Sequence, residues 1–174
     1  MMKTTKIVEM RWPEIKDAIE KGFDTIIVAV GSSEQHGPHL PTITDTMIGE
    51  YLIDGIVKKL GNALQGPTIS IGCSDHHLTF PGTISLSAET LKLIIRDYIR
   101  SASKHNFKNI VFIPSHGGNF KPLAEAIELY KSEFSSINIL SYTNLQEYQK
   151  GGDPHDSGSP FPWEIFYPAF IKKK

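Results

Sequence analysis

Residues 24–45 read DTIIVAVGSSEQHGPHLPTITD, and this stretch decides how the rest of the chain is interpreted. Its first part is an apolar run that predicts a buried strand over 25–30, and a polar loop follows directly. The loop carries Glu34 and His36, and Asp45 stands at the start of a predicted helix. Because residues i and i+2 of extended backbone point the same way, Glu34 and His36 can converge on one point. A divalent metal needs such donors, so we interpret the stretch as the floor of a metallohydrolase site.

The donor types narrow the choice of metal. Carboxylate oxygen together with imidazole nitrogen suits zinc, manganese or divalent iron, and no thiolate lies nearby. The pattern does not choose among these three metals. Two simpler interpretations stay open: Asp45 caps the helix beside it, and Glu34 and His36 lie on an exposed loop. Because Asp is a preferred N-cap residue, we expect Asp45 to act as a cap in either case.

Length and composition limit the remaining choices. The chain has 174 residues, 40% of them hydrophobic, which predicts a single domain over 1–174 with one sizeable core. The formal net charge of -1 gives no electrostatic footprint for nucleic acid. The single cysteine, Cys73, excludes an internal disulfide and is compatible with a reducing compartment. The sequence holds no apolar segment long enough for a membrane span or a secretion signal, so we expect a soluble, cytoplasmic protein.

Apolar strands alternate with amphipathic segments along the chain. Helical spacing of apolar residues predicts helices over 12–21, 46–60, 87–103 and 123–130. Short apolar runs predict strands over 25–30, 67–71, 109–113 and 137–142. This rhythm favours a mostly parallel sheet covered on both faces, which is a three-layer α/β/α sandwich.

The architecture provides a test of the metal hypothesis, because open parallel sheets bind ligands outside the carboxyl ends of their strands. Six of the seven histidines follow predicted strands, and His105 alone lies apart, near the end of a helix. Histidines scattered over a surface would not gather after the strands. Their distribution therefore supports a metal site. The histidines that follow predicted strands are His36, His39, His76, His77, His116 and His155.

Each member of this set also has a structural interpretation. His116 could be a loop histidine bonded to a backbone carbonyl, although the two glycines after it permit close backbone approach to a bound group. Gly117-Gly118-Asn119 could be only a strand-to-helix turn, whose amides would favour negative charge such as a developing oxyanion. Adjacent residues on extended backbone face opposite ways, so at most one of His76 and His77 is expected to point into the site. His39 is expected on the surface or behind the ligands.

Three motifs resemble the creatininase family, the creatinine amidohydrolase and its relatives. They read GSSEQHGPHLP from Gly31 with Thr44-Asp45, then HLTFPGTISL from His77, then SHGGN from Ser115. The resemblance implies an α/β sandwich, two divalent metal ions, hydrolysis of a cyclic or linear amide bond, and assembly into hexamers of dimers. Carried over position by position, it makes metal ligands of Glu34, His36, Asp45 and His116, with Asp45 bridging the two ions.

The chain also departs from the family pattern. In creatininase a glutamate two positions after the last of these histidines is a further ligand, and here that position is Gly118. This places the chain with a glycine-type branch, for which creatinine is not the obvious substrate. Family members usually carry a His-Ala-Gly segment followed by Glu-Thr-Ser. His155 matches its catalytic histidine, but Pro160 replaces the glutamate expected five positions later, so we expect the domain to be truncated or altered after about residue 150.

Together these observations predict a metal-dependent amidohydrolase that acts on a non-peptide or cyclic amide through a hydroxide bridging two ions of Zn, Mn or Fe. His155 would shuttle the proton to the leaving nitrogen, and His77, Gly117 and Gly118 would bind a small-molecule amide substrate. The expected partners include no nucleic acid and no membrane, and the expected assembly is a homo-oligomer such as a hexamer.

Two alternatives remain open. One is a catalytically impaired paralogue in the same family that binds metal without efficient turnover. The other is a phosphate- or nucleotide-binding α/β protein that uses 115–119 as an anion loop. The latter is weaker, because neither G-x-G-x-x-G nor G-x-x-x-x-G-K-[ST] occurs in the sequence.

Overall fold

A parallel sheet forms the centre of residues 2–143, the part of the chain that the computed structural model describes. Its four strands lie in the order β2-β1-β3-β4. The two central strands pair in parallel along their whole length, from Thr25 opposite Asn109 to Val30 opposite Pro114. Both are buried on their two faces, which explains why they read as continuous apolar runs. The strands are β1 (Thr25–Val30), β2 (Ala63–Gln65), β3 (Asn109–Pro114) and β4 (Asn138–Ser141).

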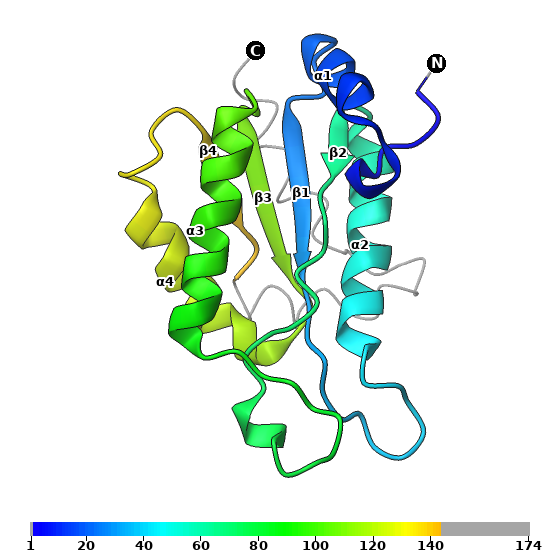
Figure 1. The fold of residues 1–174 in the computed structure, drawn as a ribbon, viewed down its shortest axis with the longest axis vertical. Helices are drawn as coiled ribbons and strands as arrows, with labels where there is room; N and C mark the ends of the chain where they lie inside the picture. The colour runs from blue at the N-terminus through cyan, green and yellow to red at the C-terminus, as the bar shows by residue number, and fades with distance from the viewer. Residues whose placement is uncertain (1, 144–174) are drawn as a thin grey trace. The chain divides into compact units, whose positions relative to one another are not determined.

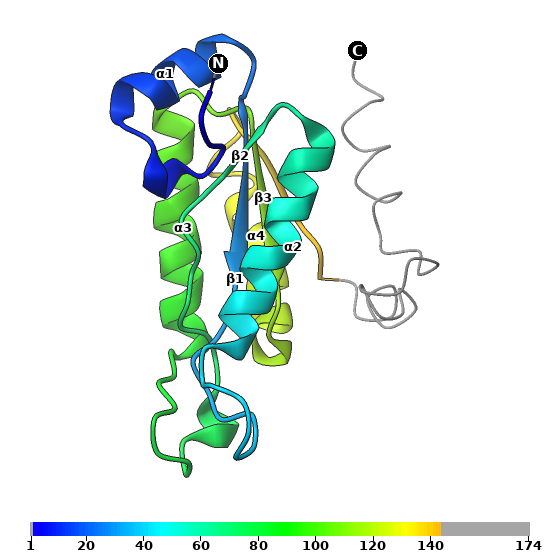
Figure 2. The same ribbon diagram turned by 90° about the vertical axis from the view of Figure 1, so that its right-hand side faces the viewer.

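Helices cover both faces of this sheet (Figures 1 and 2). Helix α2 (Thr44–Leu60) lies on one face, and α3 (Ala88–Lys104) and α4 (Phe120–Tyr130) lie together on the other. Helix α1 (Trp12–Glu20) lies near the end at which the strands begin. Three short 3-10 turns complete the described part: η1 (Ile7–Glu9), η2 (Asp75–His77) and η3 (Gly117–Asn119). The predicted α/β/α sandwich is therefore confirmed.

The buried core matches the strand and helix periodicities of the sequence, in which every second strand residue and every third or fourth helix residue share one face. Alternate residues of β1 point to the face covered by α3 and α4, where they join one apolar cluster. Helix α3 contributes to this cluster residues that recur four positions apart, and each such buried Leu or Ile is worth about 1.5–3 kcal/mol. The members from these elements are Ile26, Val28, Val30, Leu91, Ile95 and Ile99.

The second strand differs from the prediction. Pairing with β1 occupies Ala63–Gln65 instead of 67–71, and further along the chain only Ile69 forms a bridge, to Val30. Gln65 lies opposite Ile27, and Ile69 lies opposite Val30. Four steps along this segment therefore match three steps along β1, so the segment holds one extra residue after Gly66. The Gly66 amide donates to the Ile27 carbonyl and the Ile69 amide donates to the Ala29 carbonyl. The extra residue between them shifts the register with β1, which explains the early end of the strand.

The chain order creates a crevice at the carboxyl ends of the central strands. From β1 the chain crosses to β2 on one side, whereas β3 is followed by β4 on the other. The segments that leave β1 and β3 therefore diverge between the two halves of the sheet, where open α/β sheets bind ligands. Within residues 2–143, no helix has both the length and the apolar character needed to cross a bilayer.

Candidate metal centre

Two buried carboxylates and two imidazoles meet at this crevice. Glu34, Asp45 and His116 are 6%, 7% and 5% exposed, and His36 is half-buried. His36 Nε2 lies 3.1 Å from Asp45 Oδ1, and His116 Nδ1 lies 2.9 Å from Asp45 Oδ2 and 3.4 Å from Glu34 Oε1. The structure thus brings together the four residues predicted to be metal ligands, from the loop after β1, the first turn of α2 and the end of β3.

Asp45 does not act as the cap of α2. The helix begins at Thr44, so Asp45 lies in its first turn, and the N-cap residue Ile43 makes no side-chain capping bond. The expectation of a capping Asp45 is wrong because its carboxylate is directed to the two histidines instead. A negative charge in the first helical turn is still favoured by the helix dipole. The hydroxyl of Ser115 donates to the Asp45 carbonyl at 2.7 Å, which ties this turn to the end of β3.

Backbone carbonyls set the orientation of both imidazoles. His116 Nε2 lies 3.0 Å from the carbonyl of Cys73, and His36 Nδ1 lies 3.2 Å from that of Glu34. In the neutral ring, the nitrogen that faces a carbonyl carries the hydrogen and donates it, which leaves the opposite nitrogen with its lone pair. The lone pairs of His116 Nδ1 and His36 Nε2 then face the carboxylates. This arrangement, with one nitrogen held by a carbonyl, is typical of histidines that bind metals.

The same contacts test whether a cation fits. Glu34 Oε2 is buried without a hydrogen-bond partner, and the buried Asp45 Oδ2 has the ring nitrogen of His116 beside it at 2.9 Å. Buried carboxylate oxygens beside nitrogen lone pairs repel one another unless a cation or a proton lies between them. The side chains present therefore suit a divalent metal. Within residues 2–143, two groups of three residues hold ligand atoms within 4.8 Å of one another: Glu34, His36 and Asp45, and Glu34, His76 and His116.

The surroundings of His116 shift its pKa. Burial of the ring lowers its pKa, whereas the carboxylate of Asp45, the carbonyl of Cys73 and the charge of Glu34 raise it. The net effect is a pKa above the ordinary value for histidine.

His76 and His77 both approach the site. Their segment forms the 3-10 turn η2 and not extended backbone, so the expectation that at most one would point inward is wrong. His77 Nε2 lies 3.9 Å from Glu34 Oε1, and its Nδ1 lies 3.2 Å from the amide nitrogen of the Gln35 side chain. The ring of His76 stacks on that of His116, with centroids 5.9 Å apart and an angle of 4° between the planes. Sequence reasoning gave His76 no role, because its proximity depends on this turn.

The two glycines after His116 differ in their surroundings. A Cβ atom on Gly118 would lie 2.1 Å from the Cys73 carbonyl oxygen, whereas one on Gly117 would meet no atom within 4 Å. Gly118 is therefore required for the close approach of the carbonyl that orients His116. Binding of substrate at Gly117, Gly118 and His77 stays a prediction.

Asn119 joins three segments beneath the site and was given no role by the sequence. Its side chain is fully buried, and its oxygen accepts from the Cys73 amide at 2.9 Å. Its nitrogen donates to the carbonyls of Val30 and Gly31, at 3.1 and 2.8 Å. Asn119 thereby fixes the Cys73 peptide to the end of β1. The amide side chain directly after two glycines is the sequence signal that could have indicated this role, because a buried amide needs hydrogen-bond partners.

The remaining histidines lie elsewhere. His39 is exposed on the loop after β1, as expected, and His105 follows the last residue of α3. The predicted catalytic residue His155 lies outside the described residues.

The chain is similar to known proteins in both sequence and fold. The family model for creatininase, described as creatinine amidohydrolase, matches residues 8–161. The chain is 42% identical over 113 residues to the mycofactocin precursor peptide peptidase of Mycolicibacterium smegmatis, covering 62% of this chain and 45% of that protein. It is 35% identical over 140 residues to the protein of the same name from Mycobacterium tuberculosis, covering 75% and 53%.

Solved structures show the same fold. A structure named "Creatininase Mn" has a TM-score of 0.76 and 25% sequence identity, and the match covers 87% of this chain and 62% of that one. The chain spans about half the length of the curated relatives it matches.

Proposed function

Because the chain belongs to the creatininase family, we propose that it is a metal-dependent amidohydrolase that uses two divalent metal ions. One observation carries the proposal: ring nitrogens of His36 and His116 lie 3.1 and 2.9 Å from the two oxygens of the buried Asp45 carboxylate, and Oε2 of the buried Glu34 has no hydrogen-bond partner. Hydrophobic or hydrogen-bonded side chains would be more stable in such a crevice, so the arrangement is best explained by a bound cation.

The four residues have distinct parts in this proposal. Asp45 would bridge the ions, since its two oxygens lie 3.1 Å from His36 and 2.9 Å from His116. The ions, when bound, would acidify a water molecule between them and supply hydroxide near neutral pH, the nucleophile for an amide carbonyl. His77 has its Nδ1 held by Gln35, so its Nε2 would donate a hydrogen bond and orient the substrate carbonyl. His155 would donate the proton to the leaving nitrogen, a step worth about 10²- to 10⁴-fold in rate.

The substrate class remains a choice between two kinds of amide. The glycine-type motif Ser115–Asn119 favours a non-peptide or cyclic amide other than creatinine, as the sequence predicts. The names of the two relatives reported above, at 42% and 35% identity, favour a peptide amide instead. Both classes contain the carbon–nitrogen bond that hydroxide would attack, so both belong in the same assay.

The test is reconstitution of the full chain. The purified protein is stripped with a chelator, then loaded separately with Zn²⁺, Mn²⁺ or, without oxygen, Fe²⁺. Elemental analysis measures bound metal, and amine release measures hydrolysis of a short peptide, a formamide and a cyclic amide. We expect two ions per chain and hydrolysis that the chelator abolishes.

Other outcomes separate the alternatives. Two bound ions with no turnover on any amide would support the impaired paralogue and contradict the enzymatic proposal. A protein that binds phosphate but none of the three metals would overturn the metal site itself and favour the anion loop.

A further inference from the structure

The two groups of candidate ligands share Glu34 and differ in their other two residues. One group adds His36 and Asp45, which the sequence motif already contains. The other adds His116 and also His76, which lies 40 residues before His116 on a different loop. His76 has no part in the proposed function so far. Its position beside two candidate ligands needs an explanation.

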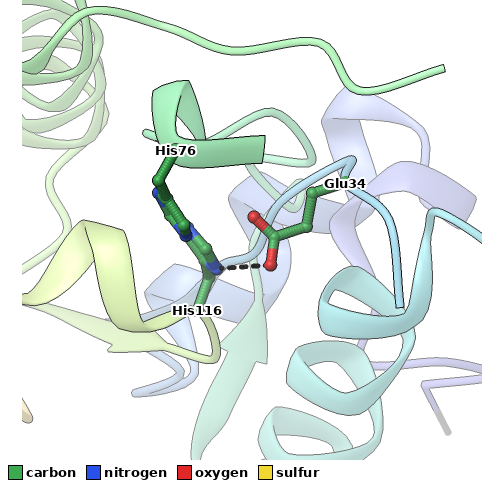
Figure 3. Close-up of side chains that lie close together, drawn as sticks. All are labelled: Glu34, His76 and His116. Atoms are coloured by element: carbon green, nitrogen blue, oxygen red, sulfur yellow. Dashed lines mark ion pairs between the residues drawn. The ribbon is translucent and has the colours of Figure 1, made fainter. Parts of the chain in front are cut away.

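The geometry around His116 places His76 on the open side of the centre. Figure 3 shows the rings of His76 and His116 stacked, with the Glu34 carboxylate facing them. The ring planes differ by only 4°, and their centroids are 5.9 Å apart. His76 is exposed, whereas Glu34 and His116 are buried. His76 also contacts the ring of His77, with centroids 4.2 Å apart.

The opposite side of His116 cannot supply a ligand. The Cys73 carbonyl occupies it and accepts the hydrogen of His116 Nε2. A side chain at position 118 would collide with this carbonyl, since even a Cβ would lie 2.1 Å from the oxygen. A further ligand for an ion at His116 Nδ1 must therefore come from another direction, and η2 provides one.

We propose that His76 is a metal ligand, and that with Glu34, His116 and the bridging Asp45 it forms the site of one ion, while His36 and Asp45 hold the other. This inference rests on the proposed function. Imidazole nitrogen and carboxylate oxygen are donors that zinc and manganese accept, and a site that expands to five ligands keeps a position for water or substrate beside these four. Because His76 is exposed, its ion is the one closer to solvent. We therefore expect this ion to exchange more readily than its neighbour.

The test compares His76→Ala with His39→Ala, using Mn²⁺ and Zn²⁺ as probes on the full chain. His39 is also exposed and lies in neither candidate group, so it controls for loss of a surface histidine. Competition with a chromophoric chelator measures each dissociation constant. We expect His76→Ala to weaken one of two sites by at least about 10- to 100-fold, the loss that even indirect partners of a ligand cause. His39→Ala should leave both constants unchanged.

A second measurement separates ligation from a structural effect. Co²⁺ is loaded into each protein, and its visible absorption reports the donors around the ion. His76→Ala should change the spectrum of one of the two ions, and circular dichroism should show an unchanged fold. If the unsubstituted protein binds two ions and His76→Ala keeps both affinities and the spectrum, this inference is wrong while the proposed function stands. If the unsubstituted protein binds no ion, the proposed function itself fails.

Discussion

At Asp45, a single carboxylate contacts two imidazoles through different oxygens. If this side chain bridges two ions, its removal should affect both. We predict that Asp45→Ala loses both ions together, whereas His36→Ala, which removes a ligand of one ion, retains the other. Elemental analysis after gel filtration measures the metal content.

Asp45→Asn is the matched control, because it keeps the size of the side chain and removes its charge. It should bind metal more weakly than the unsubstituted protein but fold normally. Retention of two ions by Asp45→Ala would contradict the bridging role.

Gly118 illustrates how a missing side chain can matter. We predict that Gly118→Ala destabilises the protein by about 1–3 kcal/mol, the usual cost of inserting a methyl group into packed structure. The reason is the 2.1 Å separation between the added Cβ and the Cys73 carbonyl oxygen. Urea unfolding measures the change in the free energy of unfolding. Gly117→Ala is the control and should change stability by no more than about 0.5 kcal/mol, since its Cβ meets nothing within 4 Å. Equal losses in the two variants would contradict this account.

The sequence indicated some of these residues and not others. The spacing of Glu34 and His36, and the place of His116 after a strand, were enough to predict that they meet. The proximity of His76 was not predictable, because it depends on a 3-10 turn instead of extended backbone. The role of the Cys73 carbonyl was also not predictable, because every residue has a carbonyl and only the fold decides which one faces His116.

Among the elements, the long apolar runs were the easiest to predict. The strand over 25–30 was placed correctly, and the one over 109–113 was one residue short, because a run buried on both faces has few other structures available. The strand β2 was misplaced because the apolar pattern continues beyond Gly66, whereas a register shift of one residue between Gly66 and Ile69 ends the regular pairing. Where pairing stops thus depends on hydrogen bonding, which hydrophobicity does not report.

The junction of β1, η3 and the loop before η2 depends on Asn119. We predict that Asn119→Ala lowers the free energy of unfolding by at least about 1–3 kcal/mol, because it leaves buried backbone groups without a partner. These are the Cys73 amide and the carbonyls of Val30 and Gly31. Metal affinity should also fall, since the Cys73 peptide that orients His116 loses its anchor. Chemical denaturation and the chelator competition measure the two effects.

The control for this prediction is Asn138→Ala, at the exposed start of β4. Its side chain bonds only to that of Asn109 among the contacts described, so its loss should cost no more than about 0.5 kcal/mol. An Asn119→Ala variant as stable as this control would show that the junction does not depend on the amide.

At the scale of the described chain, residues 2–143, the candidate centre lies where the central strands β1 and β3 end. Its ligands come from the segments that follow these two strands. An ion bound there would hold these segments together only in the folded state. Binding should therefore stabilise the fold, by about 2.7 kcal/mol per ion at a free concentration 100 times the dissociation constant.

For a chain of this length we predict a rise in melting temperature of about 5–10 °C per bound ion, or about 10–20 °C for two, on addition of Mn²⁺ or Zn²⁺ to the stripped protein. Differential scanning calorimetry measures the change, and excess chelator should reverse it. Asp45→Ala serves as the control and should show no shift. A shift of the same size in that variant would place the stabilising ions elsewhere.

The most direct test is anomalous diffraction from crystals of the full chain grown with Mn²⁺. The account predicts anomalous peaks among the carboxylates of Glu34 and Asp45 and the rings of His36 and His116. A map from Mn²⁺-saturated crystals with no peak between these four side chains would contradict it.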